Sequence, residues 1–215
     1  MTNARKFSYL REMDRQGYNA GAIGPFNEFM IPWLLARHGV GKDQAVVDIG
    51  AGQGHGLIPL HSKGWRNLVA ADVEDYKFES FRKEYGFRTV LCDISSQRLD
   101  LPDAAAGAVL CVHVIEHLAD PSNLMAESHR ILRQGGKLFL VTPNWRRLYR
   151  RFYGDPTHVH PYDKVSLARL LRIFGFSAEV HSWNTRFGLG RLRAYRLIPR
   201  LGMIGTNILA VGVKA

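Results

Sequence analysis

The chain has 215 residues, 46% of them hydrophobic, and carries 29 Lys and Arg against 19 Asp and Glu, a net charge of +10. This composition is typical of a globular protein, and the length predicts a single domain. Two cysteines, Cys92 and Cys111, are too few for a disulfide scaffold or a cysteine-rich zinc module. The sequence shows no apolar run of the roughly 20 residues that cross a membrane and no apolar core of a signal peptide, so we expect a soluble cytoplasmic protein.

The elements are predicted from the pattern of apolar residues. Residues 1–44 are expected to be mainly helical, as a cap, and from residue 45 onward short apolar runs alternate with helical stretches. We expect strands at 45–50, 67–73, 88–94, 106–115, 137–143, 177–183 and 206–215. We expect helices at 55–63, 74–85, 120–132 and 166–174, and irregular insertions at 144–163 and 184–205. This alternation predicts an α/β, doubly wound fold with a parallel sheet and helices on both faces.

A glycine-rich loop follows the first predicted strand and opens a helix. It reads Asp48-Ile49-Gly50-Ala51-Gly52-Gln53-Gly54, the pattern D-x-G-x-G-x-G. Glycines in such a turn let a ligand approach the main chain. A dinucleotide fingerprint would need a glycine at position 55, which is His55, and an acid before the first glycine would repel a pyrophosphate. The loop therefore favours a ligand that is cationic or rich in hydrogen-bond donors.

Acidic residues also end the second and third predicted strands. Asp72 is placed where a carboxylate accepts hydrogen bonds from ribose hydroxyls, and Asp93 where it can accept from an exocyclic amine such as that of adenine. Each alone could equally be a turn or helix-cap residue. Three acids at three successive strand ends favour a ligand site, because those ends line the crevice of an open α/β sheet.

These segments together resemble the class I S-adenosylmethionine-dependent methyltransferases, and especially the small-molecule branch that includes quinone-biosynthesis enzymes. The segments are VVDIGAGQG, AADV, LCDI, VIEHLADPSNLMAESHRILRQGGKLFLVTPN and DPTHVHPY. The resemblance implies a Rossmann-like seven-stranded sheet, mostly parallel, whose last strand is antiparallel. It also implies S-adenosylmethionine as the cofactor. The residues implied to bind it are Asp48, Gly50, Gly52, Gly54, Asp72, Val73, Asp93, Ile94 and His113.

Histidines supply the candidate groups on the acceptor side. The resemblance implies that the loop around His158 reaches over the active site, and we expect His158 to act as a general base or to orient the acceptor. His117 is a second candidate catalytic residue, with a pocket-wall or capping role as its alternative. His158 and His160 have metal-like spacing, but no third ligand accompanies them in the sequence, so we expect no metal.

The excess positive charge lies in the last third of the chain. Residues 1–143 contain 16 basic and 16 acidic side chains, whereas residues 144–215 contain 13 basic and 3 acidic ones. We expect Arg147, Arg150, Arg151 and His160 to bind the substrate. The same arginines could face an anionic membrane, RNA or only solvent, as could those of the segment 186–200.

The expected function is transfer of a methyl group from S-adenosylmethionine to a small or lipid-linked, anionic acceptor, by O- or N-methylation. An RNA methyltransferase and a non-catalytic cofactor-binding protein are the two alternatives. We expect one domain over residues 1–215. It would consist of the N-terminal cap 1–44, a cofactor-binding core 45–143, and acceptor-side insertions with the last two strands in 144–215.

Overall fold

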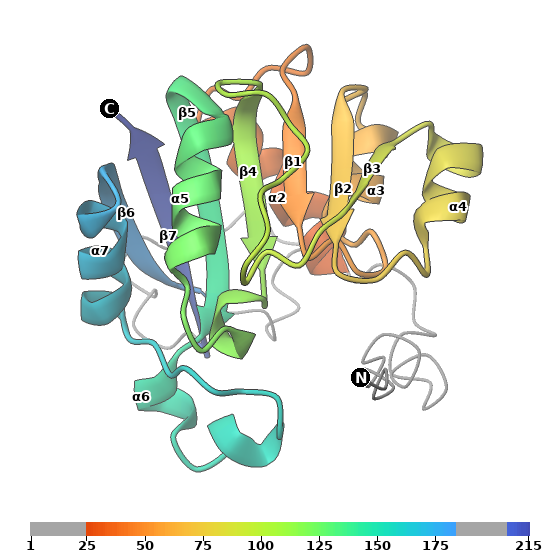
Figure 1. Cartoon of the computed structure of the whole chain (residues 1–215). Helices are drawn as coiled ribbons and strands as arrows, with labels where there is room; N and C mark the ends of the chain where they lie inside the picture. Colours follow the sequence, from red (N-terminus) through yellow and green to blue (C-terminus); the bar gives the residue numbers. More distant parts are fainter. Residues whose placement is uncertain (1–24, 184–205) are drawn as a thin grey trace.

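The computed structural model describes residues 25–183 and 206–215, and its centre is a seven-stranded sheet (Figure 1). The strands are β1 (Val46–Ile49), β2 (Leu68–Asp72), β3 (Arg88–Leu91), β4 (Ala106–Val112), β5 (Leu132–Pro143), β6 (Phe176–Trp183) and β7 (Asn207–Lys214). Their order across the sheet is β3-β2-β1-β4-β5-β7-β6. β7 pairs antiparallel with both β5 and β6, and the other pairs are parallel. The predicted sheet is confirmed, including the antiparallel last strand.

Helices cover both faces of this sheet (Figure 1). They are α2 (Pro25–Arg37), α3 (Leu57–Ser62), α4 (Phe78–Ser80), α5 (Ser122–Ile131) and α7 (Lys164–Ile173), whereas α6 (Trp145–Leu148) lies beyond the end of the sheet. α5 and α7 pack on one face, where Leu124 and Leu171 join a core that includes Val47 and Ile49. α2, α3 and α4 pack on the other face, over a core that includes Val46. Alternate residues of β1 thus enter opposite cores, as the two-residue period of a strand requires.

Several predicted boundaries differ from the structure, among them β3, which ends at Leu91 rather than 94, and three of the differences have a visible cause. The helix expected at 74–85 is only α4 followed by a π-helical turn, Phe81–Tyr85, which Gly86 ends at a φ of 69°. β4 ends at Val112 rather than 115, because His113 adopts a φ of 56° that no strand continues through. β5 begins at Leu132 rather than 137, since the pairing shifts between Ala106 and Ala108 and the glycines at 135 and 136 lie in that irregular stretch.

Of the two predicted insertions, the structure describes 144–163 and not 184–205. The first contains α6, a 3₁₀ turn at Phe152–Gly154, and a bridge between Asn144 and Tyr162. The second, with the arginines of 186–200, lies outside the described residues, as do residues 1–24 of the predicted cap. Among the described helices, none is long and apolar enough to cross a membrane.

Candidate functional site

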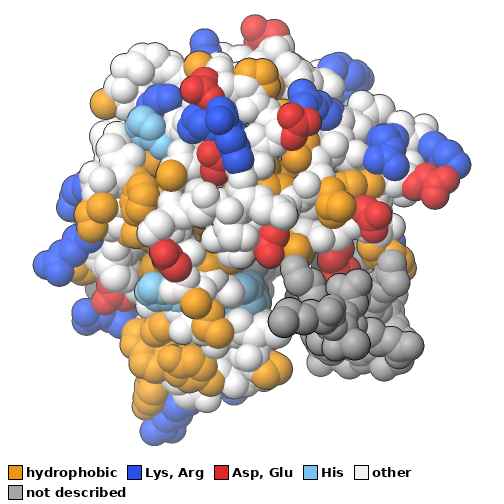
Figure 2. Space-filling model, viewed as in Figure 1, with side chains coloured by type: hydrophobic (Ala, Val, Ile, Leu, Met, Phe, Trp, Pro, Cys, Tyr) orange, Lys and Arg blue, Asp and Glu red, His pale blue; other side chains and the backbone are white. Residues whose placement is uncertain are grey.

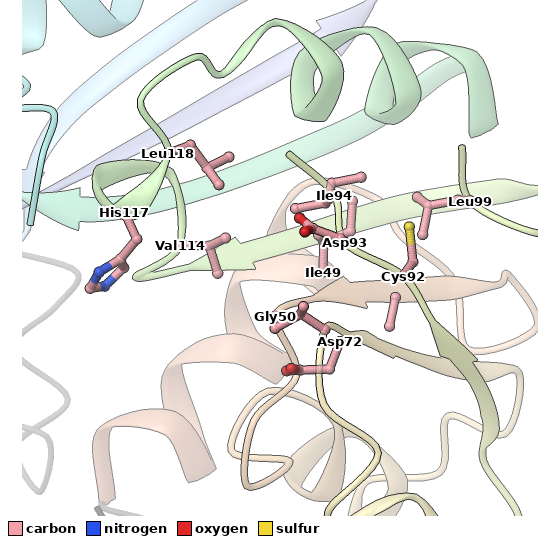
Figure 3. Close-up of a pocket in the computed structure, with 12 residues that line it drawn as sticks. Ile49, Gly50, Asp72, Cys92, Asp93, Ile94, Leu99, Val114, His117 and Leu118 are labelled. Carbon is pink, nitrogen blue, oxygen red and sulfur yellow. The ribbon is translucent and has the colours of Figure 1, made fainter. Parts of the chain in front are cut away.

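A pocket lies at the carboxyl ends of the first four strands (Figure 3). Its walls are Ile49, Gly50, Ala71, Asp72, Val73, Cys92, Asp93, Ile94, Leu99, Val114, His117 and Leu118. This is the edge of an open α/β sheet at which ligands bind. Five of the predicted cofactor residues and one predicted catalytic residue are in this set. Asp48, Gly52, Gly54 and His113 are not, and their places are described below.

The glycine loop is held between the end of β4 and the π-helical turn. Gly50 has a φ of 77°, and its N–H donates to the carbonyl of Ala71 at 2.8 Å. A Cβ at Gly50 would overlap the side chain of Val114, and one at Gly54, whose φ is 80°, would press on Phe81. Only glycine combines this backbone with this packing, so the loop keeps its main chain at the pocket wall.

Asp48 lies directly under the loop and is buried. In the described part of the chain its Oδ1 has no hydrogen-bond partner, and its Oδ2 is so near Gly56 that a Cβ there would overlap it. Burial, helped by the charge of Asp72, raises the pKa of Asp48 to about 7. An unpartnered buried oxygen of this kind can accept a hydrogen bond from a donor group of a ligand.

Asp72 joins the loop to the pocket. Its Oδ2 accepts from the N–H of Gly52 at 2.9 Å, and its Oδ1 from the N–H of Glu74 at 3.0 Å. Burial raises the pKa of Asp72, while these two backbone bonds oppose the shift. The carboxylate points into the pocket in Figure 3, and each oxygen retains a lone pair for a ligand hydroxyl.

The opposite wall is a loop, residues 93–103, which follows β3. Asp93 accepts from the N–H and hydroxyl of Ser95, so it caps a turn while also lining the pocket. Asp93 therefore has the turn-capping role that the sequence left open, and its hydrogen bond to an exocyclic amine of a ligand stays a prediction. Asn123 of α5 donates to the carbonyls of Ile94 and Gln97 at 2.9 and 2.8 Å.

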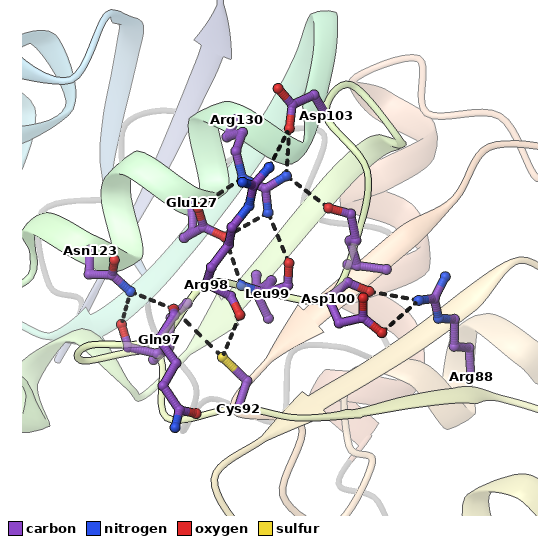
Figure 4. Close-up of polar contacts among 12 residues, drawn as sticks. Arg88, Cys92, Gln97, Arg98, Leu99, Asp100, Asp103, Asn123, Glu127 and Arg130 are labelled. Carbon is purple, nitrogen blue, oxygen red and sulfur yellow. Dashed lines mark hydrogen bonds and ion pairs between the residues drawn. The ribbon is translucent and has the colours of Figure 1, made fainter.

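An ionic network ties the rest of this loop to α5 (Figure 4). Arg130 forms hydrogen bonds to Glu127 at 2.7 and 2.8 Å, to Asp103 at 2.7 Å, and to the carbonyls of Leu99 and Leu101. Glu127 in turn accepts from the N–H of Leu99 at 2.7 Å. Leu99 is a pocket residue, so α5 fixes the position of that wall. This network was not predicted from the sequence, because neither Arg130 nor Glu127 contacts the pocket.

The turn after β4 carries His113, Val114, Glu116 and His117. His113, expected to bind the cofactor, is 43% exposed, and its Nδ1 lies 3.1 Å from Oε1 of Glu116. Glu116 is fully buried, and its Oε2 accepts from the hydroxyl of Thr142 at 3.0 Å. His117 stands at the edge of the pocket in Figure 3. The turn therefore lies between the pocket and the 155–160 loop, which follows β5.

The structure brings His158 to His117. Their ring centroids are 4.9 Å apart, although about 40 positions separate the two residues in the chain. The N–H groups of Val159 and His160 donate to the carbonyl of Glu116, which fastens the 155–160 loop to the turn. The ring of His160 stacks on Tyr162 at 4.5 Å and 10°. His158 and His160 thus occupy different positions, and it is the ring of His158 that packs against the ring of His117.

The three candidate arginines lie on and after α6 and contribute no side chain to the pocket wall. Arg150 lies over the ring of Tyr149 at 5.5 Å. Figure 2 shows hydrophobic side chains gathered over this segment, with basic ones at its edge. Tyr149 and Tyr153 are 55% and 59% exposed. The segment is therefore a basic and aromatic surface beside the site.

Other wall residues were not predicted from the sequence. Leu99 and Leu118 are apolar side chains in loops and form no pattern of their own, and Cys92 was expected to be only a buried thiol. Burial raises the pKa of Cys92, which keeps the thiol protonated. Leu99 and Cys92 supply the apolar surface that the flat face of a base requires.

The donor set fits one kind of ligand. Asp72 and Asp93 line the pocket and offer acceptors to a vicinal diol and an exocyclic amine, and Asp48 is a third acid at this sheet edge, buried under the glycine loop. S-adenosylmethionine carries an ammonium, a ribose diol and an exocyclic amine. At Gly50 no side chain stands between such a ligand and the main chain of the loop.

Comparisons with known proteins agree with this site. Residues 47–140 match the methyltransferase domain family. The chain is 31% identical over 147 residues to a Mycolicibacterium smegmatis protein named a probable S-adenosylmethionine-dependent methyltransferase, covering 67% of this chain and 56% of that one. It is 26% identical over 123 residues to the ubiquinone biosynthesis O-methyltransferase of Pseudomonas aeruginosa, covering 55% of this chain and 52% of that one. The chain thus spans about half the length of these curated relatives.

The fold agrees as well. A solved S-adenosylmethionine-dependent methyltransferase from Archaeoglobus fulgidus superposes with a TM-score of 0.69 at 21% identity, covering 94% of this chain and 99% of that one. The matched family residues include the glycine loop and all three strand-end acids. On these grounds the chain belongs to the class I S-adenosylmethionine-dependent methyltransferases, with S-adenosylmethionine as the cofactor.

Proposed function

We propose that the protein methylates a small or lipid-linked, anionic acceptor. The observation that carries this proposal is the position of His117, which lines the cofactor pocket and also meets His158 of the loop beyond β5. The two histidines join the pocket to the basic and aromatic segment that follows β5. An acceptor held there would reach the cofactor side of the sheet.

The chain's own residues contribute binding and orientation. S-adenosylmethionine, when bound, supplies a methyl group already activated by a sulfonium, so alignment and exclusion of water are the main requirements. Asp48, Asp72 and Asp93 hold the cofactor, and Val114 packs against Gly50 at the end nearest the acceptor side. His117 and His158 orient the acceptor.

The acceptor's charge is inferred from the segment after α6. Its basic groups are arginines, whose planar guanidinium can hold a phosphate or carboxylate in a fixed orientation. Tyr149 and Tyr153 add exposed aromatic surface beside them. Basic and aromatic side chains next to each other suit an acceptor with an anionic group and a lipid tail, and a membrane surface that carries it.

The first test measures transfer. The protein is incubated with methyl-labelled S-adenosylmethionine and the chloroform-soluble and aqueous fractions of a bacterial extract, with and without ribonuclease. We expect label in an anionic, chloroform-soluble product. Label lost on ribonuclease treatment would favour the RNA alternative, and no label in any fraction would contradict the proposal.

The second test separates the two sides of the site. His158→Ala is expected to lower turnover about 100-fold or more, with little change in the affinity for S-adenosylhomocysteine measured by calorimetry. Replacing Arg147, Arg150 and Arg151 together by Gln is expected to weaken binding to anionic vesicles, and the loss should shrink as salt rises. Wild-type turnover in both variants would contradict the assignment of the acceptor side.

A further inference from the structure

The sequence showed no third ligand beside His158 and His160 and so predicted no metal, but the fold brings Glu116 and His117 to His158, and these three residues form a cluster that a metal ion could occupy. One potential ligand atom of each lies within 4.8 Å of those of the other two. The cluster is assembled from the turn after β4 and from the loop beyond β5, which are held together by the two backbone bonds to the carbonyl of Glu116. These three side chains are the donor set, two imidazoles and one carboxylate, of many catalytic metal sites.

The hydrogen bonds of His158 fix its tautomer. Its Nδ1 lies 2.7 Å from the carbonyl of Phe152, and a carbonyl only accepts. Neutral His158 therefore carries its proton on Nδ1, which leaves the lone pair on Nε2. The ring also packs against that of Phe152, with centroids 4.6 Å apart. Both contacts hold the imidazole in one orientation.

His117 has the same arrangement. Its Nδ1 lies 3.2 Å from the carbonyl of Thr157 and 2.9 Å from the Thr157 hydroxyl. That hydroxyl gives its own proton to Asp155, so it accepts from the ring. His117 thus also carries its proton on Nδ1 and its lone pair on Nε2. Metal-binding histidines are oriented in this way, with the second nitrogen donating to a carbonyl or an oxygen of the outer shell.

Glu116 supplies the anionic ligand and is itself held in place. Its side chain is fully buried between the hydroxyl of Thr142 and the ring of His113. A buried carboxylate is costly without a cation or a full set of donors. Asp155, whose Oδ2 lies 3.9 Å from Nε2 of His158, adds a second acid beside the cluster. The surroundings therefore suit a positive ion.

We propose that Glu116, His117 and His158 bind a divalent metal ion of the Zn²⁺ class, with an open coordination position that takes a hydroxyl oxygen of the acceptor. Imidazole ligands favour such ions over Mg²⁺ or Ca²⁺. His117 belongs to both the cluster and the cofactor pocket, which directs the open position to the methyl donor. The acceptor role rests on the proposed function, whereas the metal site does not.

The step balances without a further reactant. A metal-bound hydroxyl loses its proton to water at lower pH than a free one. The resulting oxygen attacks the methyl carbon, so that a C–O bond forms as the C–S bond breaks and its electron pair stays on sulfur. The products are a methyl ether and a neutral thioether. The histidines then orient the acceptor through the ion, and the acceptor class is narrowed to hydroxyl compounds.

The test uses untagged full-length protein stripped with a chelator and titrated with Zn²⁺ by calorimetry and with Co²⁺ by visible absorption. We expect one saturable site. His158→Ala should weaken it about 100-fold or more, and Thr157→Val, which removes the hydroxyl that accepts from His117 and donates to Asp155, about tenfold or more. His181→Ala, an exposed histidine on β6, serves as the matched control and should leave the affinity unchanged.

S-adenosylhomocysteine binding is measured on the same samples. No saturable Zn²⁺ or Co²⁺ binding, or equal affinity in all the variants, overturns the metal site. If the metal site is overturned but S-adenosylhomocysteine still binds, the proposed function stands without a metal. If metal binds but turnover on a hydroxyl acceptor is the same in stripped and loaded protein, the acceptor role is overturned and the site remains.

Discussion

Burial of Asp48 makes the stability of the cofactor-free protein depend on pH. Its pKa is about 7 in the folded chain, against 3.8 for an unperturbed aspartate, with burial as the main cause. Near pH 4 the folded protein holds this proton almost fully. As the pH rises towards 7, the unfolded chain has lost the proton while the folded one still binds it, so the free energy of unfolding falls. The difference converts to about 4 kcal/mol at pH values above 7.

Asp48→Asn removes the charge and keeps the shape. We expect the variant to match the wild type near pH 4 and to become more stable than it by up to about 4 kcal/mol at pH 8.5. The measurement is urea unfolding without cofactor, across pH 4 to 8.5. Asp75→Asn, which replaces an exposed carboxylate after β2 and keeps Asp48, is the control and should show the same dependence of stability on pH as the wild type.

The reasoning would be refuted by a difference between Asp48→Asn and wild type that does not change with pH. A variant that loses stability at alkaline pH would also refute it, because that result would mean that the charged form of Asp48 is stabilised in the folded protein. A cationic cofactor group should favour the charged form, so S-adenosylmethionine binding at pH 6 should release a proton. The binding heat would then vary with the ionisation enthalpy of the buffer.

Three further predictions concern the walls of the pocket. Arg130→Met should lower the free energy of unfolding by about 2 kcal/mol and weaken S-adenosylhomocysteine binding, because Leu99 loses its anchor; unfolding curves and calorimetry check both effects, and unchanged binding would contradict the link. Gly50→Ala should reduce the affinity at least tenfold, and adding Val114→Ala should restore part of it; absence of any rescue would show that the overlap is not the cause. Asp72→Ala should weaken binding by about 1–3 kcal/mol, and tight binding of NAD in place of S-adenosylhomocysteine would contradict the whole site.

The local parts of the site were predictable from the sequence. Asp48 with the glycines after it, Asp72 and Asp93 each lie at or just past the end of a strand, so a short pattern fixes both the conformation and the edge of the sheet. Gly50 could be singled out as the first glycine of the pattern D-x-G-x-G-x-G, and the structure gives it a φ of 77°. Fold and cofactor follow from such patterns, which act within a few residues.

The parts that depend on distant contacts were not predictable. His117 and His158 meet because the loop beyond β5 returns to the carbonyl of Glu116, and no spacing in the sequence reveals this. Arg130 and Glu127 both bond to a loop about 30 residues earlier in the chain. β5 begins early because of its irregular pairing with β4, which depends on the partner strand as much as on its own residues.

The position of β7 has a consequence for the order of assembly during synthesis. β6 is made before β7, yet β7 lies between it and β5. β7 therefore attaches β6 to the rest of the sheet. Until residues 207–214 are available, β5 is an edge strand. The half of the sheet that carries the three acids needs only residues before 144, so it can form earlier. The strands that carry the three acids can therefore be organised before β7 joins β5 and β6 into one sheet.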